Sequence, residues 1–174
     1  IDTIGIIIGA AKIGAITAPI NSRFKTTELE QVIVHAGMKV IFTSSSEVGT
    51  DFNGLINETF PQIATSSSKH LDFPEAPELE ALITLDEINR PGTFNLTDIG
   101  EMANTISDES VAKSQEGVRV RDTAIIMYTS GTTAMPKGAM LSHESFNRYA
   151  SSVKQRMLLT EEDIFWAALP MFHI

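Results

Sequence analysis

An apolar run joined without a break to a loop of hydroxyls and glycines limits this chain to few folds. Residues 124–128 are continuously apolar, as in a central strand that is buried on both faces of its sheet. Residues 129–138 then carry four hydroxyls, two glycines and a lysine. In α/β folds the loop after such a strand is the usual place for a ligand. The pattern therefore predicts an α/β fold with a polyphosphate-binding loop at the edge of its sheet.

The N-terminal part alternates between helix and strand patterns. Apolar spacing predicts a buried helix over 3–14, a short strand over 15–19 and another strand over 39–43. Between the two strands, Thr27–Glu30 matches a capping box, which predicts a helix that begins there and ends near Gly37. Such alternation favours a mostly parallel sheet flanked by helices.

The middle of the chain is punctuated by serine and proline, and its apolar stretches are short. We expect it to be irregular apart from a weak acidic helix over 97–103. Order returns after the loop, with a brief strand over 139–141, a helix over 144–158 that starts near Ser142, and a buried strand over 164–169. We therefore expect one incomplete α/β domain over 1–174, with helix and strand units over 1–48, an irregular excursion over 49–117, and the loop with its strands and helix over 118–174.

Composition argues against several classes of function. The chain has 13 basic and 22 acidic residues and a formal net charge of -9, which disfavours nucleic acid as a partner, because phosphate backbones bind to dense Lys and Arg surfaces. It has no cysteine and therefore no disulfide or thiolate site, which fits a cytoplasmic location. The apolar stretch 4–20 is interrupted by Lys12 and three glycines, so we interpret it as core and not as a transmembrane segment.

Each residue type in the loop suits a polyphosphate. Gly131 allows the backbone to approach an anion closely, and Lys137 supplies a mobile positive charge. Hydroxyls that can donate hydrogen bonds to phosphate oxygens belong to Thr129, Ser130, Thr132 and Thr133. The Walker pattern Gly-x-x-x-x-Gly-Lys-Ser/Thr is not met, because Pro136 stands where its second glycine should be. A Walker-type NTPase is therefore disfavoured.

The segment Tyr128-Thr129-Ser130-Gly131-Thr132-Thr133-x-x-Pro136-Lys137-Gly138 resembles the phosphate-loop signature of the adenylate-forming superfamily, which contains acyl-CoA synthetases, luciferases and the adenylation domains of peptide synthetases. Leu169–His173 resembles the next motif of that superfamily, Pro-x-Phe-His, and Gly14–Asn21 resembles an upstream segment. The similarity covers most of the chain apart from its middle. It implies that the chain is part of the large N-terminal domain of such an enzyme.

The resemblance implies an enzyme that joins a carboxylate to AMP, releases pyrophosphate and passes the acyl group to a thiol, amine or oxygen. Our leading hypothesis is a carboxylate–CoA ligase, in which the acceptor is the thiol of CoA. His173 would be catalytic, at the junction of the acyl and nucleotide pockets, where an imidazole can donate to the carboxylate or to an α-phosphate oxygen. ATP, Mg²⁺ and CoA are the implied cofactors and co-substrates, the acid is expected to be a fatty or related one, and no residue is assigned to a metal. The residues expected to bind the ATP phosphates are Thr129, Ser130, Gly131, Thr132, Thr133, Lys137 and Gly138.

Two alternatives remain open. Ala134 stands where the superfamily usually has glycine, and an alanine that needs a positive φ would weaken phosphate binding. The protein would then be a non-catalytic nucleotide-binding or scaffold unit. The other alternative is the adenylation domain of a peptide synthetase, although Gly131–Thr133 and Met140–His143 look more like an acyl-CoA synthetase. His143 itself is interpreted as a helix cap or a packing residue.

The sequence contains nothing that resembles the later motifs of the superfamily. It begins without Met and stops directly after a hydrophobic run, so both ends look cut from a longer protein. We therefore expect the 174 residues alone to be inactive. Exposed sheet edges and apolar faces would favour association into a homo-oligomer.

Overall fold

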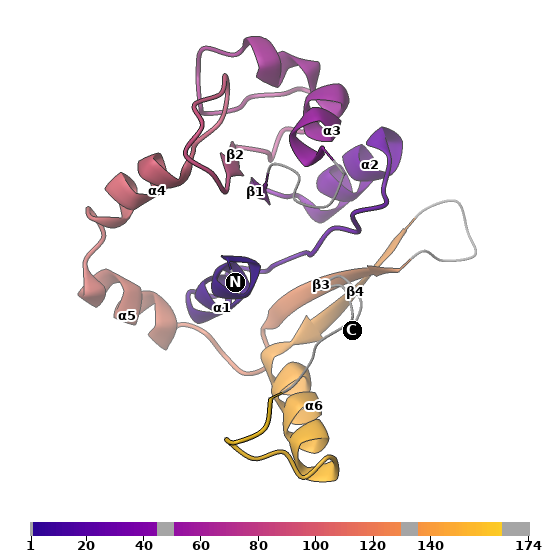
Figure 1. The fold of residues 1–174 in the computed structure, drawn as a ribbon, viewed down its shortest axis with the longest axis vertical. Helices are drawn as coiled ribbons and strands as arrows, with labels where there is room; N and C mark the ends of the chain where they lie inside the picture. Colours follow the sequence, from indigo (N-terminus) through magenta and orange to yellow (C-terminus); the bar gives the residue numbers. More distant parts are fainter. Residues whose placement is uncertain (1, 45–50, 130–135, 165–174) are drawn as a thin grey trace. The chain divides into compact units, whose positions relative to one another are not determined.

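The computed structural model describes residues 2–44, 51–129 and 136–164. The chain forms two compact units, a middle unit (Ile20–Ser107) and a terminal unit (Ile1–Pro19 with Asp108–Ile174). Figure 1 shows that helices and strands are intermixed along the chain, which confirms the predicted α/β class. In chain order the elements are α1 (Asp2–Lys12), α2 (Thr26–Ala36), β1 (Val40–Thr43), α3 (Phe52–Thr59), the 3-10 helix η1 (Pro61–Thr65), β2 (Ala81–Thr84), α4 (Leu96–Ala103), α5 (Asp108–Glu116), β3 (Thr123–Thr129), β4 (Lys137–Ser142) and α6 (His143–Arg156).

The middle unit is built on a parallel pair of strands, β1 and β2. Val40 lies opposite Ala81, and Thr43 lies opposite Thr84. Parallel strands need a crossover connection, and α3 lies within the connection between these two. The apolar faces of α2 and α3 join the inward residues of both strands in one core cluster, which includes Leu29, Ile33, Ile41, Ile56 and Leu82.

Helix α2 has its N-cap two residues earlier than the capping-box pattern predicts. The N-cap is Lys25 and not Thr27, and the backbone N–H of Lys25 donates to the carboxylate of Glu28 at 2.9 Å. Glu28 therefore fills the position that the sequence assigns to Glu30, and the helix starts at a lysine that the Ser/Thr pattern does not include. The helix ends as predicted at Gly37, which has a φ of 58°.

The segment 49–117, which the sequence predicts to be irregular, contains regular elements and much of the core. Its described part holds α3, η1, β2, α4 and α5, and α4 matches the predicted acidic helix. The core cluster takes Phe60, Ile63 and Leu79 from this segment, and the Phe60 ring stacks on Phe73 with the centroids 5.8 Å apart. Because each element is short and interrupted, the apolar side chains form a core only after the fold brings them together.

In the terminal unit β3 is a central strand. It pairs antiparallel with β4 on one side. On the other side Thr17 forms a parallel bridge to β3: its N–H donates to the carbonyl of Ala124 at 3.1 Å, and its carbonyl accepts from the N–H of Ile126 at 2.8 Å. The strand predicted over 15–19 is thus a single bridge. The apolar run is a strand with hydrogen bonds on both sides, as predicted.

Helix α1 confirms the predicted N-terminal helix. Gly14, just after it, has a φ of 78°, and a Cβ there would lie 3.2 Å from Cγ2 of Val118. The sequence predicts that this helix is buried, but the structure leaves Ile4 and Ile8 about half exposed. None of the described helices is long and apolar enough to cross a membrane.

Helix α6 confirms the predicted helix after the loop. Its N-cap is Ser142, whose hydroxyl oxygen accepts from the N–H of Ser145 at 3.2 Å. A capping hydroxyl satisfies one of the free amides in the first turn and so sets where the helix begins. Of the strand predicted over 164–169, only Ile164 lies within the described residues.

Candidate functional site

The candidate site is the end of the β3–β4 hairpin at which the chain enters and leaves residues 130–135. Thr129 ends β3, Lys137 begins β4, and the two residues lie opposite each other in the antiparallel ladder. The Thr129 hydroxyl donates to the backbone carbonyl of Lys137 at 3.5 Å. Both residues are exposed. A residue with a hydroxyl and a residue with a cationic side chain therefore form the last cross-strand pair before the loop.

The side chain of Lys137 is exposed. Among the residues that the structure describes, Lys137 forms no ion pair. In the same unit Glu144 is held by Arg148, with the charged atoms 2.7 Å apart, and lies 3.9 Å from Arg121. An ammonium group without a carboxylate partner can donate to the oxygens of an anionic ligand.

Gly138 lies opposite Tyr128, one residue pair farther from the loop. A Cβ at Gly138 would stand 2.9 Å from Cγ2 of Ile126 and 3.3 Å from Cζ of Tyr128, so no side chain fits without a shift. Tyr128 is 8% exposed, and burial raises the pKa of its hydroxyl above the ordinary value. The space at Gly138 is thus filled from within the hairpin.

The structure brings together three of the residues predicted to bind ATP, namely Thr129, Lys137 and Gly138. The other predicted residues, together with Ala134, lie outside the described residues: Ser130, Gly131, Thr132, Thr133 and the catalytic candidate His173. The sequence did not single out Tyr128 as part of the hairpin base. The available signal was an aromatic residue one position before the loop and a glycine one position after its lysine.

His143 is the first residue of α6. Its backbone N–H donates to the carbonyl of Asp122 at 3.1 Å. Its Nε2 is buried and has no hydrogen-bond partner among the described residues. The sequence predicts that His143 is either a helix cap or a packing residue. Because the N-cap is Ser142, the structure supports the packing role.

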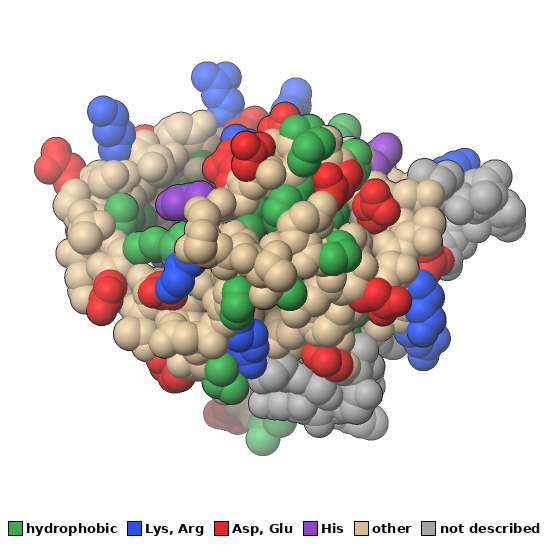
Figure 2. All heavy atoms as spheres, turned by 90° about the horizontal axis from the view of Figure 1, so that it is seen from above, with side chains coloured by type: hydrophobic (Ala, Val, Ile, Leu, Met, Phe, Trp, Pro, Cys, Tyr) green, Lys and Arg blue, Asp and Glu red, His purple; other side chains and the backbone are tan. Residues whose placement is uncertain are grey.

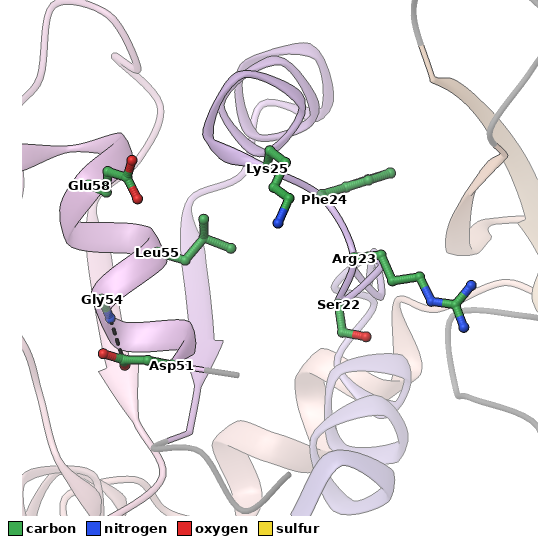
Figure 3. Close-up of a pocket in the computed structure, with 8 residues that line it drawn as sticks. All are labelled: Ser22, Arg23, Phe24, Lys25, Asp51, Gly54, Leu55 and Glu58. Atoms are coloured by element: carbon green, nitrogen blue, oxygen red, sulfur yellow. Dashed lines mark hydrogen bonds between the residues drawn. The ribbon is translucent and has the colours of Figure 1, made fainter. Parts of the chain in front are cut away.

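A cavity of about 640 Å³ lies in the middle unit, between the segment before α2 and helix α3 (Figure 3). Lys25 and Leu55 point into the space between these segments, whereas Arg23 points away from α3. Asp51 caps α3 by accepting from the N–H of Gly54 at 2.8 Å, so this amide is already satisfied. The cavity is open and its charges are mixed, so it indicates no particular ligand. Its lining residues are Ser22, Arg23, Phe24, Lys25, Asp51, Gly54, Leu55 and Glu58.

The described surface carries charges of both signs. Figure 2 shows acidic side chains interspersed with Lys and Arg on the face that it displays. Over the described ranges 2–44, 51–129 and 136–164, no group of three or more His, Asp or Glu side chains could hold a metal ion.

Comparison with known proteins finds relatives along the whole chain. Residues 1–174 match the family model described as AMP-binding enzyme. The chain is 26% identical over 163 residues to the putative acyl-CoA synthetase YngI of Bacillus subtilis, covering 94% of the chain and 30% of that protein. It is 31% identical over 169 residues to the long-chain-fatty-acid–CoA ligase FadD13 of Mycobacterium tuberculosis, covering 95% of the chain and 27% of that protein. The chain thus spans less than a third of the length of either relative.

Solved structures share the fold. The ATP-bound structure of MatB from Rhodopseudomonas palustris matches with a TM-score of 0.61 and 20% identity, covering 99% of this chain and 28% of that protein. At this identity the likeness concerns the fold alone. It confirms the predicted α/β fold.

Proposed function

The chain belongs to the family of AMP-binding enzymes, and on that premise we propose that its protein is an ATP-dependent acid–thiol ligase. The enzyme activates a carboxylic acid, fatty or related, as an acyl-adenylate and then forms an acyl-CoA thioester. The two curated relatives support the proposal, since they are named as an acyl-CoA synthetase and a CoA ligase. The structural observation that carries it is the placement of Thr129 beside Lys137 at the base of the loop.

In the first step a carboxylate oxygen of the acid attacks the α-phosphorus of ATP. The bond between that phosphorus and the bridging oxygen of the β-phosphate breaks, and pyrophosphate leaves with the electron pair. Because a carboxylate is a weak nucleophile, catalysis depends on alignment and on neutralising the leaving group. The ammonium of Lys137 donates to oxygens of the β- and γ-phosphates, and the hydroxyl of Thr129 donates beside it.

The remaining loop residues complete the phosphate site in this proposal. Ser130, Thr132 and Thr133 donate hydroxyl hydrogen bonds, and Gly131 lets the backbone approach the phosphates. Gly138 closes the loop after the lysine. His173 donates to the carboxylate or to an α-phosphate oxygen where the acyl and nucleotide pockets meet. In the second step the CoA sulfur attacks the acyl carbonyl carbon, and AMP leaves.

Magnesium belongs to the substrate, Mg-ATP. Mg²⁺ usually keeps several waters and binds through substrate phosphates with one or two carboxylates. Within the part of the chain that the structure describes, no group of three or more His, Asp or Glu side chains could hold a metal ion. In this scheme the ion therefore arrives on the nucleotide, where it offsets the charge of the phosphates.

A cytoplasmic location is proposed from the absence of cysteine, which suits a reducing compartment. A fluorescent fusion of the complete protein would test the location. Association into a homo-oligomer is also proposed, because the hydrophobic residues Ile4, Ile8 and Met140 are exposed. Light scattering from the purified protein at several concentrations would test the association.

ATP–pyrophosphate exchange by the complete protein tests the proposed reaction. Short-chain, medium-chain, long-chain and aromatic acids are each assayed with Mg-ATP. Exchange stimulated by one class of acid would establish acyl-adenylate formation and identify the substrate class. No exchange with any acid, despite measurable ATP binding, would instead support a non-catalytic nucleotide-binding unit. Product analysis with CoA then separates a CoA ligase from a peptide-synthetase adenylation domain, which would load a carrier protein.

The 174 residues by themselves are proposed to be inactive. They correspond to 30% and 27% of the two curated relatives, so most of the residues of a complete enzyme lie elsewhere. An exchange rate of the isolated chain equal to that of the complete protein would contradict this part of the proposal.

A further inference from the structure

We propose that Tyr128 and Gly138 are a positioning pair that holds the base of the phosphate loop. In this view Gly138 acts through packing inside the hairpin and does not act by touching phosphate. The inference rests on the proposed function, because it concerns how the same loop is held. It also revises the role of Gly138, which the sequence assigns to nucleotide binding.

The hairpin base has two differently used faces. Tyr128 lies opposite Gly138, and the next pair toward the loop is Thr129 opposite Lys137. Successive side chains of a strand point to opposite faces of the sheet. One face therefore carries the buried Tyr128 ring, and the other presents the exposed Thr129 and Lys137. The first face anchors the strand ends, and the second offers the groups that donate to phosphate.

The anchoring face has no spare room at Gly138. An added Cβ would lie 2.9 Å from Cγ2 of Ile126, and 3.3 Å and 3.4 Å from Cζ and Cε1 of Tyr128. Both neighbours belong to β3, which cannot easily withdraw. It is bonded on its far side to Thr17, whose carbonyl accepts from the N–H of Ile126 at 2.8 Å. A side chain at Gly138 would therefore push β4 away from β3.

Such a shift would act directly on the cation. Lys137 is the covalent neighbour of Gly138 and the cross-strand partner of Thr129, so displacing β4 moves Lys137 and draws its backbone carbonyl away from the Thr129 hydroxyl that donates to it. In the proposed function the Lys137 ammonium and the Thr129 hydroxyl hold the β- and γ-phosphates. AMP has neither phosphate. Disrupting the packing of Tyr128 against Gly138 should therefore weaken the binding of ATP much more than the binding of AMP. A general loss of structure would weaken the binding of both nucleotides.

The test compares variants of the complete protein by equilibrium titration with Mg-ATP and with AMP. Gly138→Ala is expected to weaken ATP binding by about tenfold or more and to change AMP binding by less than about twofold. In the double variant Ile126→Ala/Gly138→Ala the closest contact is removed, so ATP binding should return to within about threefold of the unaltered protein. Gly100→Ala is the matched control, because nothing lies within 4 Å of a Cβ at Gly100.

Rescue is the decisive readout, because a glycine needed for contact with phosphate would not be relieved by trimming Ile126. ATP binding unchanged by Gly138→Ala, or a double variant no better than the single one, would overturn the inference. If Gly138→Ala does not fold, Tyr128→Leu removes the ring without adding atoms. It is expected to weaken ATP binding and to spare AMP binding, and unchanged ATP binding would overturn the inference.

The outcomes also separate this inference from the proposed function. Absence of acid-stimulated pyrophosphate exchange in the unaltered protein counts against the ligase reaction. Normal exchange in the unaltered protein without rescue in the double variant counts against the Tyr128 and Gly138 pair alone.

Discussion

The backbone carbonyl of Lys137 accepts a hydrogen bond from the hydroxyl of Thr129 at 3.5 Å, and the two residues face each other across the β3–β4 ladder. The strand that leads into the loop is thus tied to the strand that leaves it at the last residue pair. The ammonium of Lys137 takes no part in this bond. It has no ion pair among the described residues and can therefore pair with an anion.

Replacing Lys137 with alanine tests that charge. We expect Lys137→Ala to slow the pyrophosphate exchange of the complete protein by about 100-fold or more, as is usual when one preorganised group is lost at a developing charge. Exchange rates measured at several ATP concentrations check this. Lys154→Ala, on the exposed part of α6, is the control and should change the rate by no more than about twofold. Similar losses in both variants would speak against a specific role for Lys137.

Leu158 stores backbone strain that glycine would relieve. Its φ is 54°, and its side chain is 81% exposed, so little packing compensates the strain. A residue with a side chain in the left-handed region costs about 1–2 kcal/mol, and glycine at the same position avoids this cost. Part of that gain is offset because glycine has more conformational freedom in the unfolded chain. We expect Leu158→Gly to raise the free energy of unfolding by about 0.5–1 kcal/mol in urea denaturation.

The neighbour of Leu158 provides a matched control. Met157 has a φ of -89°, which any residue adopts. Met157→Gly should therefore lower the free energy of unfolding by about 0.5–1 kcal/mol. If both glycine variants shift stability in the same direction, the strain at Leu158 is not the cause.

Three glycines should respond to alanine in a fixed order. Gly100 lies in α4 with open space around it, so Gly100→Ala should stabilise the protein by about 0.5–1 kcal/mol. Gly37 has a positive φ but room for a methyl group, so Gly37→Ala should cost about 1 kcal/mol. Gly92 combines a φ of 65° with a Cβ position 2.9 Å from the carbonyl oxygen of Ile63. Gly92→Ala should therefore cost the most, and urea unfolding that ranks it below Gly37→Ala would refute the steric argument.

The carboxylate of Asp98 should make stability depend on pH. It accepts from Nζ of Lys69 at 2.5 Å and from the N–H of Asn95 at 2.9 Å. These bonds, that of Lys69 first, lower the pKa of Asp98 below the ordinary value of 3.8. A lowered pKa in the folded state adds stability that is fully present above the unfolded pKa and is lost as pH falls through the folded pKa.

Asp98→Asn should therefore remove one part of the acid-induced loss of stability. Urea unfolding of the variant should show a shallower decline than the unaltered protein as pH falls below 3.8. Asp72→Asn, at an exposed position, is the control for the loss of one carboxylate. A decline of equal steepness in the unaltered protein and in Asp98→Asn would show that the contacts of Asp98 do not shift its pKa.

The elements around the loop were predictable because their signals are local. The apolar run that forms β3 and the Ser142 hydroxyl that caps α6 lie within a few residues of the structure they specify. The chemistry of the loop was predictable for the same reason. Its hydroxyls, glycines and lysine are consecutive, and together they carried the resemblance that the family model confirms.

The errors arose where the outcome depends on distant residues. The N-cap of α2 is Lys25, which the Ser/Thr pattern does not include, and only the folded helix shows that the Glu28 carboxylate reaches the free amide. The sequence predicts that segment 49–117 is irregular, because no single short element in it buries an apolar face alone. In the structure, however, Phe60 and Phe73 of this segment form part of the core.

Gly138 illustrates the same division. Consecutive residues were enough to indicate that a phosphate loop ends there, since residue type and order need no tertiary structure. The ring that occupies the space beside Gly138 could be identified only from the fold, because the β3–β4 register places Tyr128 opposite it. Hydrogen bonds between β3 and β4 set that register, and β3 is also held on its other side by Thr17, more than a hundred residues away along the chain. Local composition thus identifies the chemistry, and contacts between distant residues hold it in place.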